Sequence, residues 1–115
     1  MIWTLIATAL AALDPAVAYA ADVDRSILGD PLPDEFIVYE LISAVPDLHA
    51  DDAETERFYR VQISIYNRAG LTSLPDTDTA MLAQGFRFAG ETRIPFNPET
   101  GHYGLAREYT ILVNQ

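Results

Sequence analysis

The segment Phe58-Tyr-Arg-Val-Gln-Ile-Ser-Ile-Tyr66 alternates apolar and polar residues almost strictly. Successive side chains of a β-strand point to opposite faces, so a period of two indicates a strand with one buried face. The face that we expect in the core carries Tyr59, Val61, Ile63 and Ile65. The rest of the fold is predicted around this strand.

The upstream segment Glu35-Phe-Ile-Val-Tyr-Glu-Leu-Ile-Ser-Ala-Val45 carries β-branched and aromatic residues on both faces. This composition is typical of a central strand that is covered on both sides, and we expect it to pair with the 58–66 strand. The eleven connecting residues, 46–56, contain five carboxylates. They are predicted to form a solvated loop, longer than a tight hairpin needs.

Apolar residues at helical spacing span residues 2–13, and the following Asp14-Pro15 pair should end that helix, because proline disfavours the helical region for the residue before it. A second, short helix is expected near residues 75–84. Ser73 is its expected N-cap, and Gly85 followed by Phe86 suits its C-terminus.

Three more strands complete the predicted set. They are placed at residues 17–20, from Phe86 toward Glu91 or Ile94, and at residues 105–113, with irregular chain at residues 22–34 and a turn at residues 95–101. Strands grouped between helices predict an α+β fold. We expect a mostly antiparallel sheet of four to five strands with both helices on one face, in a single domain of residues 1–115.

The charge of the chain is strongly acidic. Ten Asp and seven Glu oppose seven Arg, there is no Lys, and the formal net charge is −10. Such a surface repels phosphate backbones, so we expect no nucleic-acid binding over a broad face. The absence of cysteine excludes disulfides, thiolate nucleophiles and Cys-based zinc sites.

The first 21 residues superficially resemble a secretory signal that ends in Ala18-Tyr-Ala20. A basic n-region is missing, and Asp14-Pro15 interrupts the approach to the cleavage point. The apolar run is also shorter than the roughly 20 residues that span a bilayer, so no membrane partner is expected. If these residues were cleaved, an exported small binding domain would be the alternative reading.

The sequence contains no strong motif for catalysis or for metal binding. His49 lies among Asp47, Asp51 and Asp52, which are ligand types for hard metals, but no glycine supplies the sharp turn of a calcium loop. His102 lies in a turn with no supporting motif. The chain has no nucleophile elbow and no phosphate-binding loop. We therefore expect a protein that is not an enzyme, with no metal and no cofactor.

The outward face of the 58–66 strand is less polar than a solvated face requires. Phe58 and Tyr66 flank Arg60 there, and aromatic residues are enriched in protein interfaces. These three residues are the expected subunit interface. The alternative is that the aromatic side chains pack within the chain, which is common for aromatics in strands.

The chain as a whole resembles the small tail-completion, or tail-terminator, proteins of long-tailed bacteriophages and prophages. The resemblance lies in the N-terminal helix, the acidic loop and the closing strand, together with the segments Leu32-Pro-Asp-Glu-Phe-Ile-Val-Tyr39, Tyr59-Arg-Val-Gln-Ile-Ser-Ile-Tyr-Asn67, Gln84-Gly-Phe-Arg-Phe88 and Glu99-Thr-Gly-His-Tyr103. None of these pieces is a catalytic signature, and the resemblance implies no active site. The second helix departs from the family pattern because it is short and interrupted by proline.

The resemblance implies a virion subunit, assembled in the host cytoplasm, that closes into a ring of six at the head-proximal end of the tail tube. Its partners would be itself, the tail-tube protein and a head-closure or neck protein. The acidic loop would be an arm facing a partner or the lumen, with Asp47, His49, Asp51, Asp52, Glu54 and Glu56 as the contact residues. A head-closure or other minor tail component with the same sheet is the alternative within this class.

Overall fold

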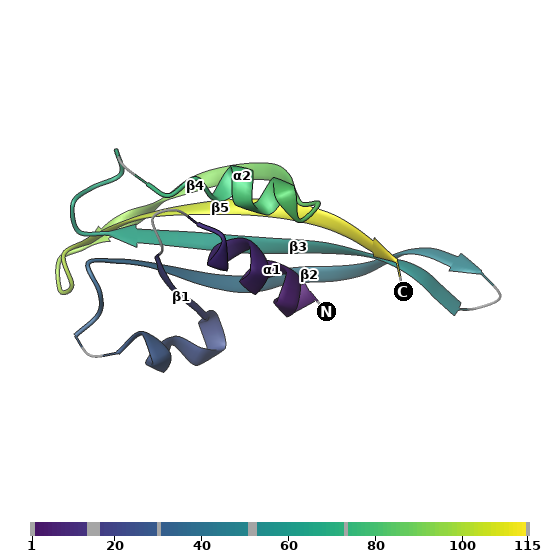
Figure 1. The fold of residues 1–115 in the computed structure, drawn as a ribbon, viewed down its shortest axis with the longest axis horizontal. Coiled ribbons are helices and arrows are strands. Elements are labelled where there is room, and N and C mark those ends of the chain that lie inside the picture. The colour runs from purple at the N-terminus through teal and green to yellow at the C-terminus, as the bar shows by residue number, and fades with distance from the viewer. Residues whose placement is uncertain (1, 14–16, 30, 51–52, 73, 115) are drawn as a thin grey trace.

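The structure is a computed structural model that describes residues 2–13, 17–29, 31–50, 53–72 and 74–114 (Figure 1). Its elements are the helices α1 (Ile2–Ala11) and α2 (Thr77–Ala83), the 3-10 helix η1 (Asp22–Leu28), and the strands β1 (Ala18–Ala21), β2 (Glu35–Ala50), β3 (Ala53–Asn67), β4 (Arg87–Asn97) and β5 (His102–Asn114). The molecule is elongated, with extents of 52 × 25 × 23 Å, along the direction of the long strands.

The five strands form one sheet in the order β1-β2-β3-β5-β4. Every neighbouring pair is antiparallel except β1 and β2, which run parallel. The predicted α+β class with a mostly antiparallel sheet is therefore confirmed. The 35–45 strand was expected at the centre of the sheet, and this expectation was wrong by one position. The central strand is β3, which pairs with a long strand on each side. β2 is next to it and pairs on its other edge with the four-residue β1.

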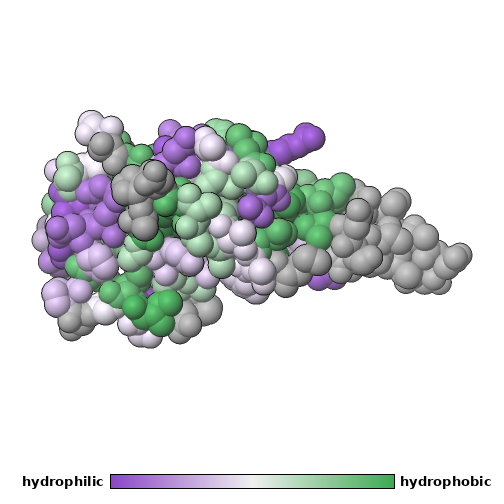
Figure 2. All heavy atoms as spheres, viewed as in Figure 1, coloured by the Kyte–Doolittle hydropathy of each residue, from purple (hydrophilic) through white to green (hydrophobic). Residues whose placement is uncertain are grey.

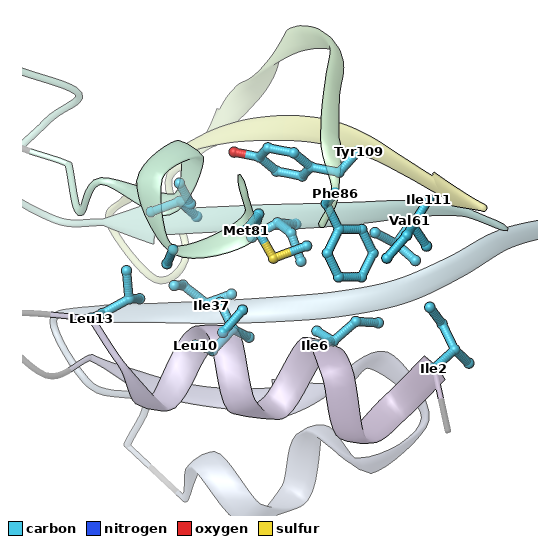
Figure 3. Packing of buried hydrophobic residues seen from close by; sticks show 14 of the residues in the cluster. Ile2, Ile6, Leu10, Leu13, Ile37, Val61, Met81, Phe86, Tyr109 and Ile111 are labelled. Carbon is cyan, nitrogen blue, oxygen red and sulfur yellow. The ribbon is translucent and has the colours of Figure 1, made fainter. Parts of the chain in front are cut away.

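Both helices cover the same face of the sheet, and the core lies between them and the strands (Figure 3). The predicted alternation of β3 is confirmed, since Tyr59, Val61, Ile63 and Ile65 are all buried. These side chains pack with Ile37 of β2 and with apolar residues of both helices. This layer is the hydrophobic core that holds the two helices on the sheet.

The helix α1 is short and strongly apolar. Ile2, Ile6, Ala9 and Leu10 recur at helical spacing and are buried. The helix ends at Ala11, slightly before the expected end at residue 13. A tighter turn follows it, in which the amide of Leu13 donates to the carbonyl of Leu10 at 3.2 Å. Leu13 nevertheless stays in the core.

The helix α2 begins at Thr77, two residues later than expected, and Ser73 lies outside the described residues. The cap is Asp76, whose carboxylate accepts from the amide of Thr79 at 3.1 Å. Hydrogen bonds from Thr79 lower the pKa of this carboxyl group. At the other end Gly85 has φ +96°, and the amide of Phe86 reaches the carbonyl of Met81 at 3.1 Å, as the sequence predicts for a glycine-terminated helix.

The segment predicted as an acidic loop is mostly strand. β2 continues to Ala50 and β3 starts at Ala53, and these two residues are paired in the register. Backbone hydrogen bonds extend an antiparallel hairpin without requiring buried side chains, which is why hydrophobic alternation failed to predict the extension. Asp51 and Asp52 lie outside the described residues, as do the side chains of Asp47, His49, Glu54 and Glu56. We call this end of the hairpin, residues 46–56, the arm.

Two other boundaries differ from expectation. The chain after β1 forms the 3-10 helix η1 instead of an irregular segment. β4 continues to Asn97, into the first three residues of the predicted turn, because Asn97 pairs with His102 at the start of β5, and residues 98–101 form the turn. Pro95 is compatible with this position because β4 is an edge strand, where one side of the backbone needs no sheet partner.

Candidate interaction surface

The outer face is the side of the sheet opposite α1 and α2. Residues that are directly opposite each other in antiparallel strands share a face, so the register assigns this surface residue by residue. On the two central strands the outer face carries Phe58, Arg60, Gln62, Ser64 and Tyr66 of β3, and Gly104, Ala106, Glu108, Thr110 and Leu112 of β5. Phe36, Val38 and Glu40 of β2 lie opposite Tyr66, Ser64 and Gln62 and share this face.

Two apolar side chains of the outer face are in solvent. Phe58 lies directly opposite Leu112, and these side chains are 38% and 48% exposed. They border a hollow of about 450 Å³ that is also lined by Gly85, Arg87, Thr110 and Ile111. On the other side of the sheet, Figure 2 shows apolar residues gathered where β2 and β3 leave the main body. The outer face therefore has an unfilled apolar site beside the base of the arm.

Arg60 lies next to this apolar pair and is neutralised within the chain. Its Nε and Nη2 atoms donate to the two carboxylate oxygens of Glu108 at 3.2 and 3.3 Å. The hydrogen bonds to Glu108 raise the pKa of the guanidinium above its ordinary value. The charge of Arg60 is therefore balanced by Glu108 on the same face, and Arg87 also lines the hollow.

The third predicted interface residue, Tyr66, lies at the other end of β3. Its ring stacks on Phe36 with centroids 4.9 Å apart and an interplanar angle of 20°. Phe36 in turn makes a T-shaped contact with the ring of His102, with centroids 4.9 Å apart. The structure thus brings Phe58 and Arg60 together and places Tyr66 in a separate aromatic cluster, where it packs within the chain.

His102 was expected in a turn but is buried at the start of β5. Its Nε2 atom lies 2.8 Å from the carbonyl oxygen of Pro33, so this nitrogen donates and the ring holds the 31–34 segment against the sheet. The histidine therefore has a structural role, joining residues that are 69 positions apart.

A buried polar network that sequence reasoning missed joins α2 to the sheet. The hydroxyl of Tyr109 donates to the carboxylate of Asp78, and Thr77 Oγ1 lies 2.7 Å from the same hydroxyl oxygen. Arg107 Nη1 donates to Thr77 Oγ1 at 2.9 Å and Arg107 Nε to Glu91 at 3.4 Å. The only signal in the sequence was that Arg107 and Tyr109 are two positions apart in a predicted strand and therefore share one of its faces.

This network makes stability depend on pH at the alkaline end. Burial, with the hydrogen bond to Asp78, raises the pKa of Tyr109 above the ordinary value of 10.0. The folded state thus holds the phenol proton more tightly than the unfolded state, and the resulting stability is present below pH 10 and is lost as pH rises above it.

We expect the free energy of unfolding to fall above about pH 10 by up to about 1.4 kcal/mol per pH unit from this group. Urea denaturation of the wild-type chain and of Tyr109→Phe, across a pH series, measures it. The variant is less stable at neutral pH but loses less stability in alkali. Equal pH slopes for the two proteins would show that Tyr109 is not the group responsible.

In the part of the chain that the structure describes, no group of three or more His, Asp or Glu side chains could hold a metal ion. Within the same residues, no helix has the length and apolar character needed to cross a membrane. The metal-ligand types around His49 lie in the arm, whose side chains are outside this description.

Comparisons with known proteins do not assign the chain to a family. No protein-family model matches the sequence, and a search of curated proteins finds no significant match. The arguments for function therefore come from the geometry of the outer face and the arm, and from the resemblance of sequence segments described above.

Proposed function

We propose that this protein is a structural subunit of a bacteriophage or prophage virion, a tail terminator that closes into a ring on the tail tube. In this role the ring stops tube growth and presents a surface to the neck of the filled head. The chain would contact copies of itself, the tail-tube protein and a head-closure or neck protein. The resemblance supplies the assignment to this class, and the outer face is the surface of the fold that suits subunit contact.

The observation that carries the proposal is the solvent-exposed Phe58 and Leu112 pair beside its hollow. The cores of protein interfaces are depleted in charge and enriched in aromatic residues. The internal pairing of Arg60 with Glu108 balances the charge next to the apolar pair, while Arg87 also lines the hollow. A contact between this patch and a different patch of the next copy is heterologous. Such contacts close into rings when the rotation between subunits permits.

The arm extends this surface. Beyond Glu56, whose partner on β5 is Asn114, the described residues of the hairpin continue as a pair of strands, β2 and β3, with no pairing to β5. Its sequence holds five carboxylates within residues 46–56. We assign the arm to contact with a partner or with the lumen of the ring, since a strand pair can carry charged groups away from the body of the subunit.

Replacing Phe58 with a charged residue tests the proposed subunit interface. We expect the wild-type chain to form a ring-sized assembly, alone or with a tail-tube protein encoded beside its gene, and Phe58→Glu to remain a monomer. Burying a carboxylate in an apolar contact is strongly unfavourable. Light scattering over a concentration series measures the mass.

The matched control is Phe96→Glu. Phe96 is also an exposed aromatic, but it lies on β4 against Tyr103, away from the outer-face pair. This variant should assemble as the wild-type chain does. A wild-type chain that stays monomeric under both conditions, or equal loss of assembly in the two variants, would contradict the proposal.

A further inference from the structure

The hollow beside Phe58 and Leu112 lies where the sheet loses one of its strands. β4 begins at Arg87, opposite Thr110, whereas β5 continues along β3 to Asn114. Among the described residues, the last part of β5, residues 111–114, therefore has β3 on one edge and no strand on the other. The backbone of such an open edge can pair with an added strand. The hollow of about 450 Å³ borders this open edge.

Arg87, which lines the hollow, is a cation without a partner in the described part of the chain. Four other arginines lie within 3.4 Å of a carboxylate oxygen, namely Arg25, Arg60, Arg68 and Arg107. Arg87 and Arg93, both on β4, have no ion pair or hydrogen bond with any residue that the structure describes. In a chain with a formal net charge of −10, the hollow is thus a local site for an occupant that carries both carboxylates and apolar side chains.

The arm has the charge that complements this hollow. Residues 46–56 contain five carboxylates and no arginine, and the apolar residue Leu48 follows Asp47. Beyond Glu56 the described backbone of β3 does not pair with β5, so this side of the arm is also an open strand edge. Figure 1 shows the arm projecting past the end of β5, away from the helices. The arm of one copy is therefore free to contact the body of another.

We propose that the arm of one copy docks in the hollow of the next copy. A strand of the arm lies along residues 111–114 of β5, an arm carboxylate lies beside Arg87, and apolar residues of the arm cover Phe58 and Leu112. Such a contact joins two different surfaces, so it is heterologous and can close into a ring. This inference rests on the proposed function, and it names the part of the neighbouring subunit that fills the outer-face hollow.

The absence of lysine from the chain gives this contact a direct test. Arg87→Lys keeps the cation and introduces a single side-chain amine, which a carbodiimide joins to a carboxylate that touches it. Isotope-labelled and unlabelled copies of the full-length variant are mixed before crosslinking. We expect mass spectrometry to find the substituted residue of one copy joined to an arm carboxylate of another. Crosslinks to the arm within one copy only, or no crosslinks to the arm, would overturn the proposal.

Arg93→Lys is the matched control. Arg93 is the other arginine of β4 without a described partner, but it lies opposite Leu105, which in turn lies opposite Ile65. Ile65 is in the core, so Arg93 is on the helix side of the sheet and away from the hollow. This variant should give no arm crosslinks between copies. Equal yields from the two lysine variants would mean that arm carboxylates react without docking, and the proposal would then be wrong.

Neutral variants measure how much the charge contributes. Arg87→Gln is expected to weaken self-association of the full-length chain about threefold, because it removes the cation that faces the arm. Arg93→Gln changes the net charge equally and should not weaken it. Light scattering over a concentration series measures association, and thermal melts by circular dichroism check folding. An arginine on an edge strand can instead keep other strands away. Stronger association of Arg87→Gln would show that role and contradict docking of the arm.

The outcomes separate the arm contact from the virion role. A ring-sized assembly in which Arg87→Lys gives no arm crosslink would overturn the arm contact and leave the ring. Arm crosslinks between copies in an assembly that neither closes into a ring nor binds the tail-tube protein would support the contact and contradict the proposed function.

Discussion

Deleting residues 1–21 is expected to leave a chain without a cooperative fold. The deletion removes α1, which places Ile2, Ile6 and Leu10 in the core, and β1, which pairs along β2. Loss of three large apolar side chains costs several kcal/mol, which is comparable to the whole stability of a small domain. Circular dichroism and amide dispersion in NMR spectra of residues 22–115 measure the result.

Point substitutions within α1 provide the matched comparison. Ile6→Ala is expected to lower the free energy of unfolding by about 2–5 kcal/mol, because it opens a cavity at a fully buried position. Thr4→Ala, on the exposed face of the same helix, should change it by about 0.5 kcal/mol or less. A chain of residues 22–115 as stable as the full-length protein would contradict this account and favour the exported-domain alternative.

Phe86→Ala is expected to cost about 3–5 kcal/mol of unfolding free energy. Phe86 is 1% exposed and follows the glycine that ends α2, so its ring joins that helix to the sheet next to Met81 and Ile111 (Figure 3). Removing the ring leaves a cavity between the two layers, which the helix terminus is too constrained to fill. Urea denaturation monitored by circular dichroism measures the loss.

The control for Phe86 is two residues away. Phe88 is 47% exposed and, among the aromatic side chains that the structure describes, contacts only the Tyr109 ring, in a T-shaped arrangement. Phe88→Ala should therefore cost about 1 kcal/mol or less. If the two alanine variants lost equal stability, the assignment of Phe86 as the residue that joins α2 to the core would be wrong.

The predictions that were confirmed came from local periodicity. The alternation of β3, the apolar stripe of α1 and the glycine end of α2 each depend on residues within a few positions, and each lies where it was expected. The arm was predicted as a loop because its sequence has no buried face. Pairing between β2 and β3 extended the strands there, an effect of tertiary context on backbone hydrogen bonding.

The candidate surfaces were only partly predictable. The sequence placed Phe58, Arg60 and Tyr66 on one face, but the charge partner of Arg60 is 48 residues away and the stacking partner of Tyr66 is on β2. Neither partner can be read from spacing along one strand. The buried network around Tyr109 was missed for the same reason, because α2 supplies Thr77 and Asp78 from a distant part of the chain.

The amino-acid sequence alone determined the class of fold, the core face of the central strand and the acidic character of the surface, because composition and short-range periodicity encode these properties. Only the tertiary structure decided the strand order, the length of the arm and the contact between the rings of Trp3 and Tyr39. Those features join residues that are far apart in the chain. Their proximity depends on strand pairing and helix packing, which no local pattern specifies.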